Sequence, residues 1–368
     1  MAGRVIVFGA TGYTGRRTAA ALVDRGLRPV LAARDADRLA DLARDLGGLE
    51  TGRADSTDPA SVRALVERDD VLVSTVGPFV RRGRPAVDAV MSAGARYLDS
   101  SGEPPFLRAV FERAAPRAVR TGATLMPAFG FDYVPGNLAG ALALRGTAAT
   151  RVDVGYFIAG NVLKGASRGT RASVAGMLLE SSFTFHGGRI TGDPPARGHR
   201  FDVAGRAREG LPVGGSEHFT LPRAHPGLRE VGVFLGTARG AARVGPLAGA
   251  VPLLRRLPGA RALTAALSET MAARPDDPAP DRPSLTARVI AVAADERGRT
   301  VGTATVRVDD VYGFTARALA WAAQRCVSAD APDFAPGALG PVDAFGIANL
   351  TDGCVESGLA VERPPASG

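Results

Sequence analysis

The stretch Gly9-Ala-Thr-Gly-Tyr-Thr-Gly15 directly follows the apolar run Arg4-Val-Ile-Val-Phe8, and residues Thr14–Arg25 behind it have helical periodicity. Glycine at these positions lets the backbone turn sharply and approach a pyrophosphate, and the amides at a helix start donate to it. Three glycines near a strand also occur as ordinary turns. A second apolar strand at Pro29–Ala33 stands at the distance of a β-α-β unit, however, and favours a dinucleotide site. Its predicted loop residues are Gly9, Ala10, Thr11, Gly12, Tyr13, Thr14 and Gly15.

The end of the second strand indicates which dinucleotide is bound. An NAD site usually places Asp or Glu there, to hold the ribose 2′-hydroxyl. Here the strand ends in Leu31-Ala-Ala-Arg34, and Asp35 follows as the expected cap of a helix at Ala36–Leu46. Arg34 can be interpreted as a solvated charge at a strand end. We prefer Arg34 facing a 2′-phosphate, with Arg38 as a second contact, and therefore expect NADPH rather than NADH.

The composition is that of a globular protein with more than one domain. The chain has 368 residues, of which 45% are hydrophobic and 22% are charged. Its net charge of +8 raises the question of nucleic-acid binding. Lys164 is the only lysine, however, and the arginines are scattered without a basic run, so we expect no nucleic-acid partner.

The sequence predicts neither a metal site nor a membrane span. Cys326 and Cys354 are far apart, with no Cys-x-x-Cys pair, and the four histidines lack metal-ligand spacing. Because the first strand starts at residue 4, we expect no signal peptide and a cytoplasmic protein. The apolar segment 244–254 is flanked by arginines and is too short to cross a bilayer. We interpret it as a buried segment or lid, or alternatively as a peripheral membrane or acyl-chain contact.

The first third of the chain alternates strands and helices, with helices expected at 59–68, 85–92 and 105–120. Six strands with crossover helices make a doubly wound parallel sheet, so the predicted fold class is α/β. The six predicted strands are Arg4–Phe8, Pro29–Ala33, Leu49–Ala54, Asp70–Thr75, Arg96–Asp99 and Ala123–Pro127.

The pattern changes beyond Gly136. Short strand-like pieces separated by Gly and Pro fill residues 181–240 and suggest an antiparallel sheet. The turn Asp295-Glu-Arg-Gly298 predicts a hairpin between strands 285–293 and 299–308. Further elements are expected as helices at 137–144, 167–180, 315–327 and 341–358, a strand at 152–158 and a loop at 274–283.

The loops that follow the parallel strands are the expected site, because ligands bind outside the carboxyl ends of such strands. Asp55 follows the third strand and is expected to flank the adenine. The loops after the fourth, fifth and sixth strands should meet around the nicotinamide. Their predicted cofactor-binding residues are Thr75, Val76, Gly77, Pro78, Ser101 and Gly102.

Three titratable residues in these loops are candidates for the catalytic acid: Glu103, Asp132 and Tyr133. A proton donor must lie within about 3 Å of the reacting atom, or one water away. Tyr133 is the first choice, because a phenol stays protonated at neutral pH. Each residue also has a structural interpretation: Asp132 as a helix cap, Glu103 as an acceptor for backbone amides, and Tyr133 as a packed aromatic.

Several motifs together resemble the saccharopine dehydrogenase-like oxidoreductases, particularly the branch of trans-acting enoyl reductases. Besides the glycine loop and Ala33-Arg34-Asp35, they are Ser74-Thr-Val-Gly-Pro-Phe79, Tyr97-Leu-Asp-Ser-Ser-Gly-Glu103, Gly130-Phe-Asp-Tyr-Val-Pro135, Ser167–Ser173 and the helix Tyr312–Ala323. The resemblance implies a Rossmann domain over 1–134 that binds NADP and an inserted α+β domain over 135–310 that shapes the substrate pocket. It further implies helices over 311–361 that pack back on the first domain, before a disordered tail at 362–368.

The resemblance also implies hydride transfer to or from a C=C, C=N or C–N bond. Our leading hypothesis is an NADPH-dependent enoyl reductase of an acyl, lipid or polyketide chain. Its substrate would be a small molecule or an acyl group on an acyl carrier protein. A saccharopine-type amine or imine oxidoreductase is the alternative, with Lys164, Arg168 and Arg171 as cations for substrate carboxylates. A protein that binds NADP without turnover is the third. A short-chain dehydrogenase is disfavoured, because no tyrosine is followed four residues later by lysine.

Overall fold

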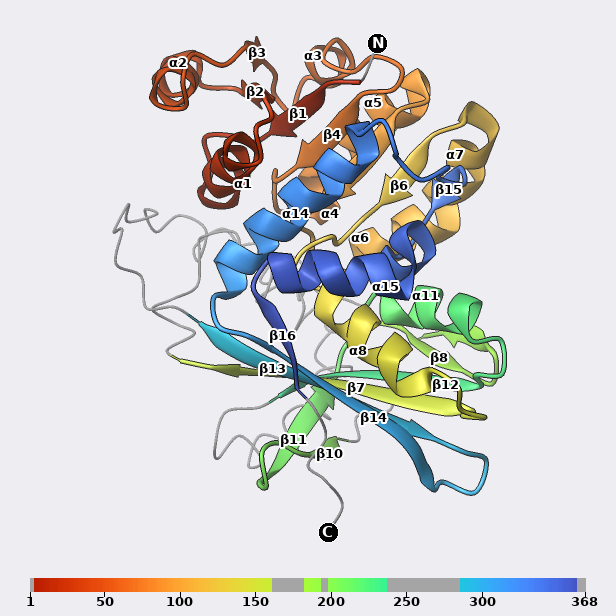
Figure 1. Ribbon diagram of the computed structural model, residues 1–368. Helices are drawn as coiled ribbons and strands as arrows, with labels where there is room; N and C mark the ends of the chain where they lie inside the picture. The colour runs from red at the N-terminus through yellow and green to blue at the C-terminus, as the bar shows by residue number, and fades with distance from the viewer. Residues whose placement is uncertain (1–2, 161–181, 193–197, 237–284, 363–368) are drawn as a thin grey trace, which may run out of the picture. The chain divides into compact units, whose positions relative to one another are not determined.

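The structure is a computed structural model that describes residues 3–160, 182–192, 198–236 and 285–362 (Figure 1). Within it the chain forms two compact units. The first comprises Met1–Gly102, Phe106–Val134 and Tyr312–Leu359. The second comprises Glu103–Pro105, Pro135–Val311 and Ala360–Gly368.

A seven-stranded parallel sheet forms the centre of the first unit, with the order β15-β6-β5-β4-β1-β2-β3. Its inner strands are apolar and buried along their whole length, as is required of a sheet covered on both faces. The predicted doubly wound α/β fold is therefore confirmed. Its strands are β1 Val5–Phe8, β2 Val30–Ala33, β3 Thr51–Arg53, β4 Val71–Ser74, β5 Arg96–Asp99, β6 Thr124–Met126 and β15 Gly337–Ala338.

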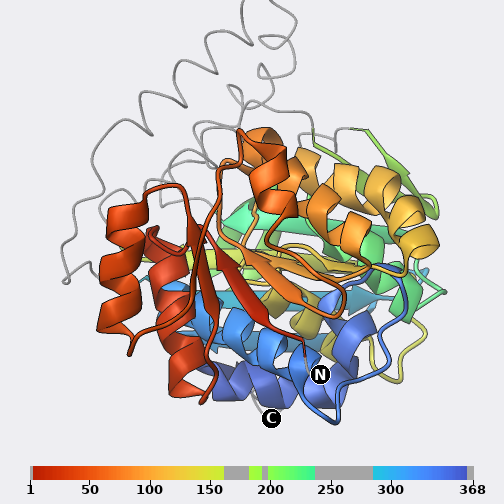
Figure 2. The ribbon, with the colours of Figure 1, turned by 90° about the horizontal axis from the view of Figure 1, so that it is seen from above.

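Helices cover both faces of this sheet (Figure 2). On one face α1 (Tyr13–Asp24), α14 (Val311–Val327) and α15 (Pro341–Glu356) lie side by side. Arg25, which ends α1, donates from Nη1 to Gln324 Oε1 of α14 at 2.8 Å and pairs with Glu356 of α15 at 2.7 Å. The other face carries α3 (Pro59–Arg63), α5 (Arg84–Ala93) and α7 (Ala115–Thr121). Shorter helices are α4 Phe79–Arg82 and α6 Pro104–Ala109, and α2 Ala36–Asp45 follows β2.

Two helices differ from the expected ones. The helix expected at 105–120 is divided by a π-helical turn at Val110–Ala114 between α6 and α7. Pro116 follows this turn and has no amide to donate four residues back, which favours a wider turn before it. The helix expected at 59–68 ends at Arg63.

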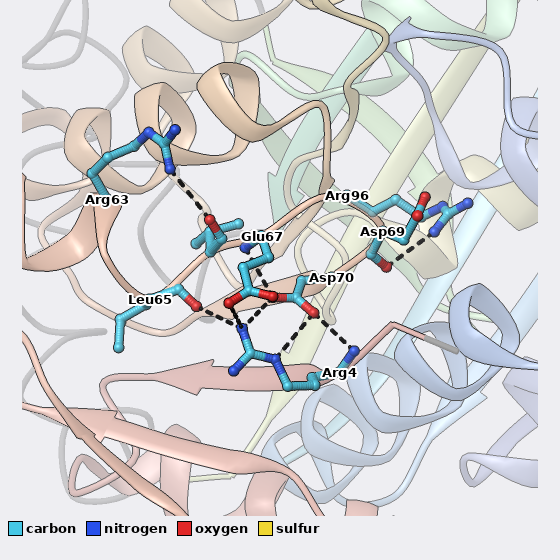
Figure 3. A network of polar contacts seen from close by, with 8 residues as sticks. Arg4, Arg63, Leu65, Glu67, Asp69, Asp70 and Arg96 are labelled. Carbon is cyan, nitrogen blue, oxygen red and sulfur yellow. Dashed lines mark hydrogen bonds and ion pairs between the residues drawn. The ribbon is translucent and has the colours of Figure 1, made fainter. Parts of the chain in front are cut away.

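The amino edge of the first sheet carries a network of polar contacts between β1 and β4 (Figure 3). The guanidinium of Arg4 lies 2.7 Å from the carboxylate of Asp70, whose side chain is only 3% exposed. Asp70 also accepts hydrogen bonds from the amides of Arg4 and Glu67, each at 2.9 Å. Its carboxylate raises the pKa of Arg4. The polar groups at this edge therefore bond to one another.

A mixed sheet, mainly antiparallel as predicted, forms the second unit with the order β10-β11-β12-β7-β13-β14-β16. β12 and β7 pair in parallel, whereas β10 with β11, β11 with β12, β7 with β13 and β13 with β14 pair antiparallel. A hairpin of β8 and β9 attaches to β12. Helices α8 (Val134–Leu144) and α11 (Glu217–Ala224) complete the described part of this unit. Its strands are β7 Arg151–Ala159, β8 Thr184–His186, β9 Arg189–Thr191, β10 His199–Asp202, β11 Ala207–Pro212, β12 Glu230–Gly236, β13 Thr286–Ala294, β14 Thr300–Val308 and β16 Leu359–Glu362.

Three details of this unit bear on the sequence predictions. The predicted hairpin is confirmed, and its Asp295 carboxylate accepts from the amides of Arg297 and Arg299 at 3.0 and 2.9 Å. Helix α11 interrupts the stretch expected to hold only strands. Glu362 was predicted to lie in the tail but is the last residue of β16, and its carboxylate accepts from Arg288 Nε at 3.0 Å. The segments 167–180, 244–254, 274–283 and 363–368 lie outside the described residues.

Candidate cofactor-binding and acid site

The glycine loop, residues Gly9–Gly15, has a backbone that only glycine fits at two of its positions. Gly9 has φ +90°, and a Cβ there would lie 2.8 Å from Thr75 Oγ1. A Cβ on Gly15 would lie 2.2 Å from the carbonyl oxygen of Gly9. Gly12 is the N-cap of α1, and no described side chain caps that helix. A helix start of this kind, without a side-chain cap, is where phosphate groups commonly bind in proteins.

The residues after β4 lie against this loop. The hydroxyl of Thr75 donates to the carbonyl oxygens of Phe8 and Gly9, each at 3.2 Å. A Cβ on Gly9 would also meet Val76 Cγ2 at 2.9 Å. Gly77 is less crowded, since a Cβ there would have only the Phe79 ring nearby, at 3.7 Å. Pro78 follows at the N-cap position of α4 and makes no side-chain capping bond. The structure thus brings the predicted loops after β1 and β4 together.

Two arginines follow β2, and one of them contacts the glycine loop. Arg34 directly follows β2 and is exposed. Arg38 donates from Nη2 to the carbonyl oxygen of Thr11 at 3.2 Å, and its amide donates to Asp35, the N-cap of α2. Asp55 follows β3, and a hydrogen bond from the amide of Thr57 lowers its pKa, as does the charge of Arg34. Positive charge is therefore concentrated where the ribose of a bound dinucleotide is expected.

Asp99 joins the loops that follow β5 and β6. This carboxylate is fully buried, and its Oδ1 accepts from the amides of Ser101 and Ala128, each at 2.8 Å. The Asp99 carbonyl oxygen accepts from the amide of Phe129 at 2.7 Å. Ala128 has φ +57°, a left-handed conformation that is uncommon for a residue with a side chain. The Asp99 contact offsets the strain of this conformation.

The loop after β6 holds two of the three predicted acids. Asp132 is half-buried, and the loss of hydration raises its pKa to about 6. Tyr133 is buried, and its hydroxyl donates to the carbonyl oxygen of Gly102 at 3.1 Å. Its proton is thus engaged by the loop after β5. Asp132, in contrast, can exchange a proton close to neutral pH.

Glu103 differs from the other two acids. It follows β5 in the chain, but it clusters with the second unit and its side chain is buried. Sequence reasoning also missed two residues of α14, Tyr312 and Thr315, that contact the predicted loops. The ring of Tyr312 packs edge-on against Tyr13 with centroids 5.1 Å apart. Thr315 Oγ1 accepts from the amide of Phe131 at 3.0 Å.

The described part of the chain contains no group of three or more His, Cys, Asp or Glu residues that would hold a metal ion. None of the helices described there has the length and apolar character needed to span a bilayer. The cations predicted for the alternative substrate, Lys164, Arg168 and Arg171, lie outside the described residues.

Comparison with known proteins agrees with the first unit's geometry. Residues 9–100 match the model of a protein family described as NAD(P)H-binding. Relatives that carry the name trans-acting enoyl reductase come from Mycobacterium tuberculosis, Mycobacterium bovis and Mycobacterium ulcerans. The first is 37% identical over 142 residues, and the other two are 36% identical over 140 residues. Each match covers 36% of this chain but only 33% or 34% of the relative, about a third of its length.

The fold is similar over nearly the whole chain to a solved structure. The apo saccharopine dehydrogenase (L-Glu forming) of Saccharomyces cerevisiae matches with a TM-score of 0.60 and 14% identity. The match covers 98% of this chain and 100% of the yeast chain. The structural match shows that this chain shares the fold of the yeast enzyme, while its sequence similarity to the trans-acting enoyl reductases extends over about a third of each chain. The chain has the saccharopine dehydrogenase fold, and residues 9–100 of its first unit match an NAD(P)H-binding family.

Proposed function

We propose that this protein is an NADPH-dependent oxidoreductase that reduces a carbon–carbon double bond of an acyl, lipid or polyketide chain. One observation carries the proposal: Asp132, whose pKa is raised to about 6, lies at the same edge of the sheet as the glycine loop. Raised pKa values of this kind are typical of catalytic acids. The name of the relatives supports the choice of an enoyl substrate.

The reaction needs a hydride, a proton and a charge stabiliser. NADPH, when bound, supplies the hydride to Cβ of the enoyl thioester. The electron pair of the double bond then moves toward the thioester carbonyl, leaving an enolate. Protonated Asp132 gives its proton to Cα, which completes the saturated chain and leaves the carboxylate ionised. An acid with a pKa of about 6 is matched to this step near neutral pH.

The residues of the first unit have separate roles in holding the cofactor. The amides at the start of α1 hold the pyrophosphate, while Gly9 and Gly15 keep the backbone close to it. Arg34 and Arg38 pair with the 2′-phosphate and thereby favour NADPH over NADH. Arg38 already lies at the loop through its hydrogen bond to Thr11. Ser101, Gly102, Thr75–Pro78 and Asp55 line the remaining carboxyl edge.

A saccharopine-type oxidoreductase of amines or imines is the second candidate. It is favoured by the fold match, which extends over 98% of this chain. This reaction uses the same hydride and proton, but the proton goes to nitrogen and the substrate carries carboxylates. A protein that binds NADP without turnover remains the third hypothesis of the set.

A substrate panel distinguishes the three. Purified protein is mixed with NADPH and enoyl thioesters of several chain lengths, as coenzyme A esters and on an acyl carrier protein, and absorbance at the reduced nicotinamide band is followed. We expect oxidation of NADPH with enoyl substrates. Oxidation only with an amino acid plus a keto acid would select the saccharopine-type reaction. Tight binding of NADPH without oxidation by any substrate would select the non-catalytic protein.

A further inference from the structure

Helix α14 contacts the loop that carries Asp132. We call residues Ala128–Val134 the acid loop. Two hydrogen bonds lie within it: the amide of Tyr133 donates to the carbonyl oxygen of Ala128 and the amide of Val134 to that of Gly130, each at 3.0 Å. Its middle is held from outside, because the amide of Phe131 donates to Thr315 Oγ1 at 3.0 Å and both groups are buried. This contact belongs to the residue next to Asp132.

The approach of α14 to the acid loop is close. A Cβ on Gly130 would lie 2.8 Å from Thr315 Cγ2, so a larger residue does not fit between the loop and the helix. Thr315 has 9% of its surface exposed. Its hydroxyl therefore serves as an acceptor that water does not readily replace.

The same helix contacts the glycine loop one turn earlier. The ring of Tyr312 meets the ring of Tyr13 edge-on, at 5.1 Å between centroids and 88° between planes. The guanidinium of Arg17 lies 5.0 Å from the centroid of the Tyr13 ring, beside the same loop. Tyr312 and Thr315 are three residues apart and thus on one side of α14. A single helix turn touches the loop after β1 and the loop after β6.

We propose that α14 positions the active site, with Thr315 holding the acid loop and Tyr312 holding the glycine loop. The assignment for Thr315 rests on the proposed function, in which Asp132 is the acid. Neither residue touches the reacting atoms in this account. Each acts through the backbone or ring that it holds.

The physical consequence differs between the two residues. Without the Thr315 acceptor, the buried amide of Phe131 turns toward water, and Asp132 moves with it. Hydration of Asp132 then lowers its pKa toward the ordinary value for an aspartate. Loss of the Tyr312 ring instead loosens Tyr13 and the phosphate-binding amides, so the affinity for NADPH falls while Asp132 keeps its surroundings.

The experiment compares Thr315→Val, which removes the acceptor oxygen at nearly constant size, with Thr315→Ser, which keeps it. The pKa of Asp132 is read by carbon-13 NMR of labelled aspartate carboxyls, assigned with Asp132→Asn, so no turnover is needed. We expect Thr315→Val to lower this pKa by at least one unit, to shift the pH profile of kcat in the same direction, and to leave the Kd for NADPH within twofold. Thr315→Ser should restore the wild-type pKa and profile.

Thr124→Val is the matched control for the Thr315 variant. Thr124 is buried in β6 and donates to the carbonyl oxygen of Ala335, but at the opposite end of the sheet. It should change neither the pKa nor the Kd. If Thr315→Val does not fold, Thr315→Ala lacks the same oxygen and takes its place. An unchanged Asp132 pKa in the folded variant overturns the assignment of Thr315.

The second arm compares Tyr312→Leu with Tyr312→Phe. Loss of an aromatic edge contact weakens binding by roughly three- to tenfold, so Tyr312→Leu should raise the Kd for NADPH by that factor. Tyr312→Phe keeps the ring and should bind as wild type, and neither variant should move the Asp132 pKa. A Kd unchanged by Tyr312→Leu overturns the assignment of Tyr312. The proposed function fails separately if none of the tested substrates causes the wild-type protein to oxidise NADPH, while the binding and pKa results above still hold.

Discussion

The two edges of the parallel sheet in the first unit differ in how their polar groups are paired. At the amino edge, Asp70 is buried and its carboxylate accepts from the side chain and amide of Arg4 and from the amide of Glu67 (Figure 3). At the carboxyl edge, α1 begins without a side-chain cap in the described structure, and burial raises the pKa of Asp132. At the amino edge the polar groups bond to one another, whereas the carboxyl edge carries helix-start amides and an acid of raised pKa.

The difference separates stability from function within a single sheet. When a buried carboxylate is paired with a cation and with amides, removing one partner alone destabilises the folded state. A carboxylate whose pKa is raised by desolvation instead destabilises the folded state when it ionises. Such groups are retained at active sites. The comparison therefore predicts which substitutions affect turnover and which affect folding.

The largest effect is expected for Asp132→Asn. If Asp132 is the acid, loss of its proton should lower kcat roughly 10²- to 10⁴-fold, the usual contribution of a positioned acid. The Kd for NADPH should stay within twofold. Asp69→Asn is the matched control, because Asp69 is exposed at the amino edge and its φ of +70° is one that asparagine tolerates. Steady-state kinetics and fluorescence titration measure both; full activity in Asp132→Asn would remove Asp132 from the mechanism.

The same residue predicts the pH profile. The acid works in its protonated form, and the protonated fraction falls as the pH rises above about 6. The rate of the chemical step should thus be level below this pH and decline above it by about tenfold per pH unit. A profile that rises between pH 5 and 8 would contradict this role.

At the amino edge, Asp70→Ala should destabilise the fold without changing the affinity for NADPH. It removes the partner of Arg4 and the acceptor of two amides, and breaking a buried pair from one side costs several kcal/mol. Because the Arg4 side chain is 39% exposed, we expect a smaller loss of about 2–3 kcal/mol in the free energy of unfolding. Urea unfolding measures it. Among molecules that remain folded, the Kd for NADPH should equal that of wild type, and a selective loss of binding would contradict the separation of the two edges.

Cofactor choice tests the arginines of the carboxyl edge. Arg34→Gln and Arg38→Gln should each weaken NADPH binding by about ten- to a hundredfold, since a charge-assisted hydrogen bond contributes about 1.5–3 kcal/mol. NADH binding should hardly change, because it lacks the 2′-phosphate. Arg44→Gln is the control, as Arg44 is an exposed residue of α2 paired with Asp41. Equal losses for both cofactors would contradict the 2′-phosphate assignment.

The candidate cofactor-binding residues were largely predictable in position, because their motifs are local. Gly9, Gly12 and Gly15 stand in one short motif, and Arg34 follows a strand that hydrophobicity identifies. The six longer strands were found in the same way. Strand β15 was missed because two residues, Gly337 and Ala338, carry no periodic pattern. It exists only by pairing with β6.

The positions of the candidate acids were predictable, but their chemistry was not. Asp132 and Tyr133 were placed after β6 by strand order, yet their ranking depends on packing. Only the fold shows that the Tyr133 hydroxyl bonds to Gly102 and that burial raises the Asp132 pKa. The bond between Phe131 and Thr315 joins residues 184 positions apart, and no local pattern in the sequence marks it.

The smallest predicted effect concerns stability at the carboxyl edge. The unfolded chain ionises Asp132 above about pH 4, whereas the folded protein does so only above about 6. The unfolded state is therefore favoured increasingly as the pH rises from 4 to 6, and the full penalty is present above 6. Because the side chain is only half-buried, we expect Asp132→Asn to be more stable than wild type by roughly 1–2 kcal/mol at pH 8, and by less at pH 4. Thermal unfolding at the two pH values measures this. The two edges together require that Asp132→Asn loses turnover and gains stability, while Asp70→Ala loses stability and keeps the wild-type affinity for NADPH.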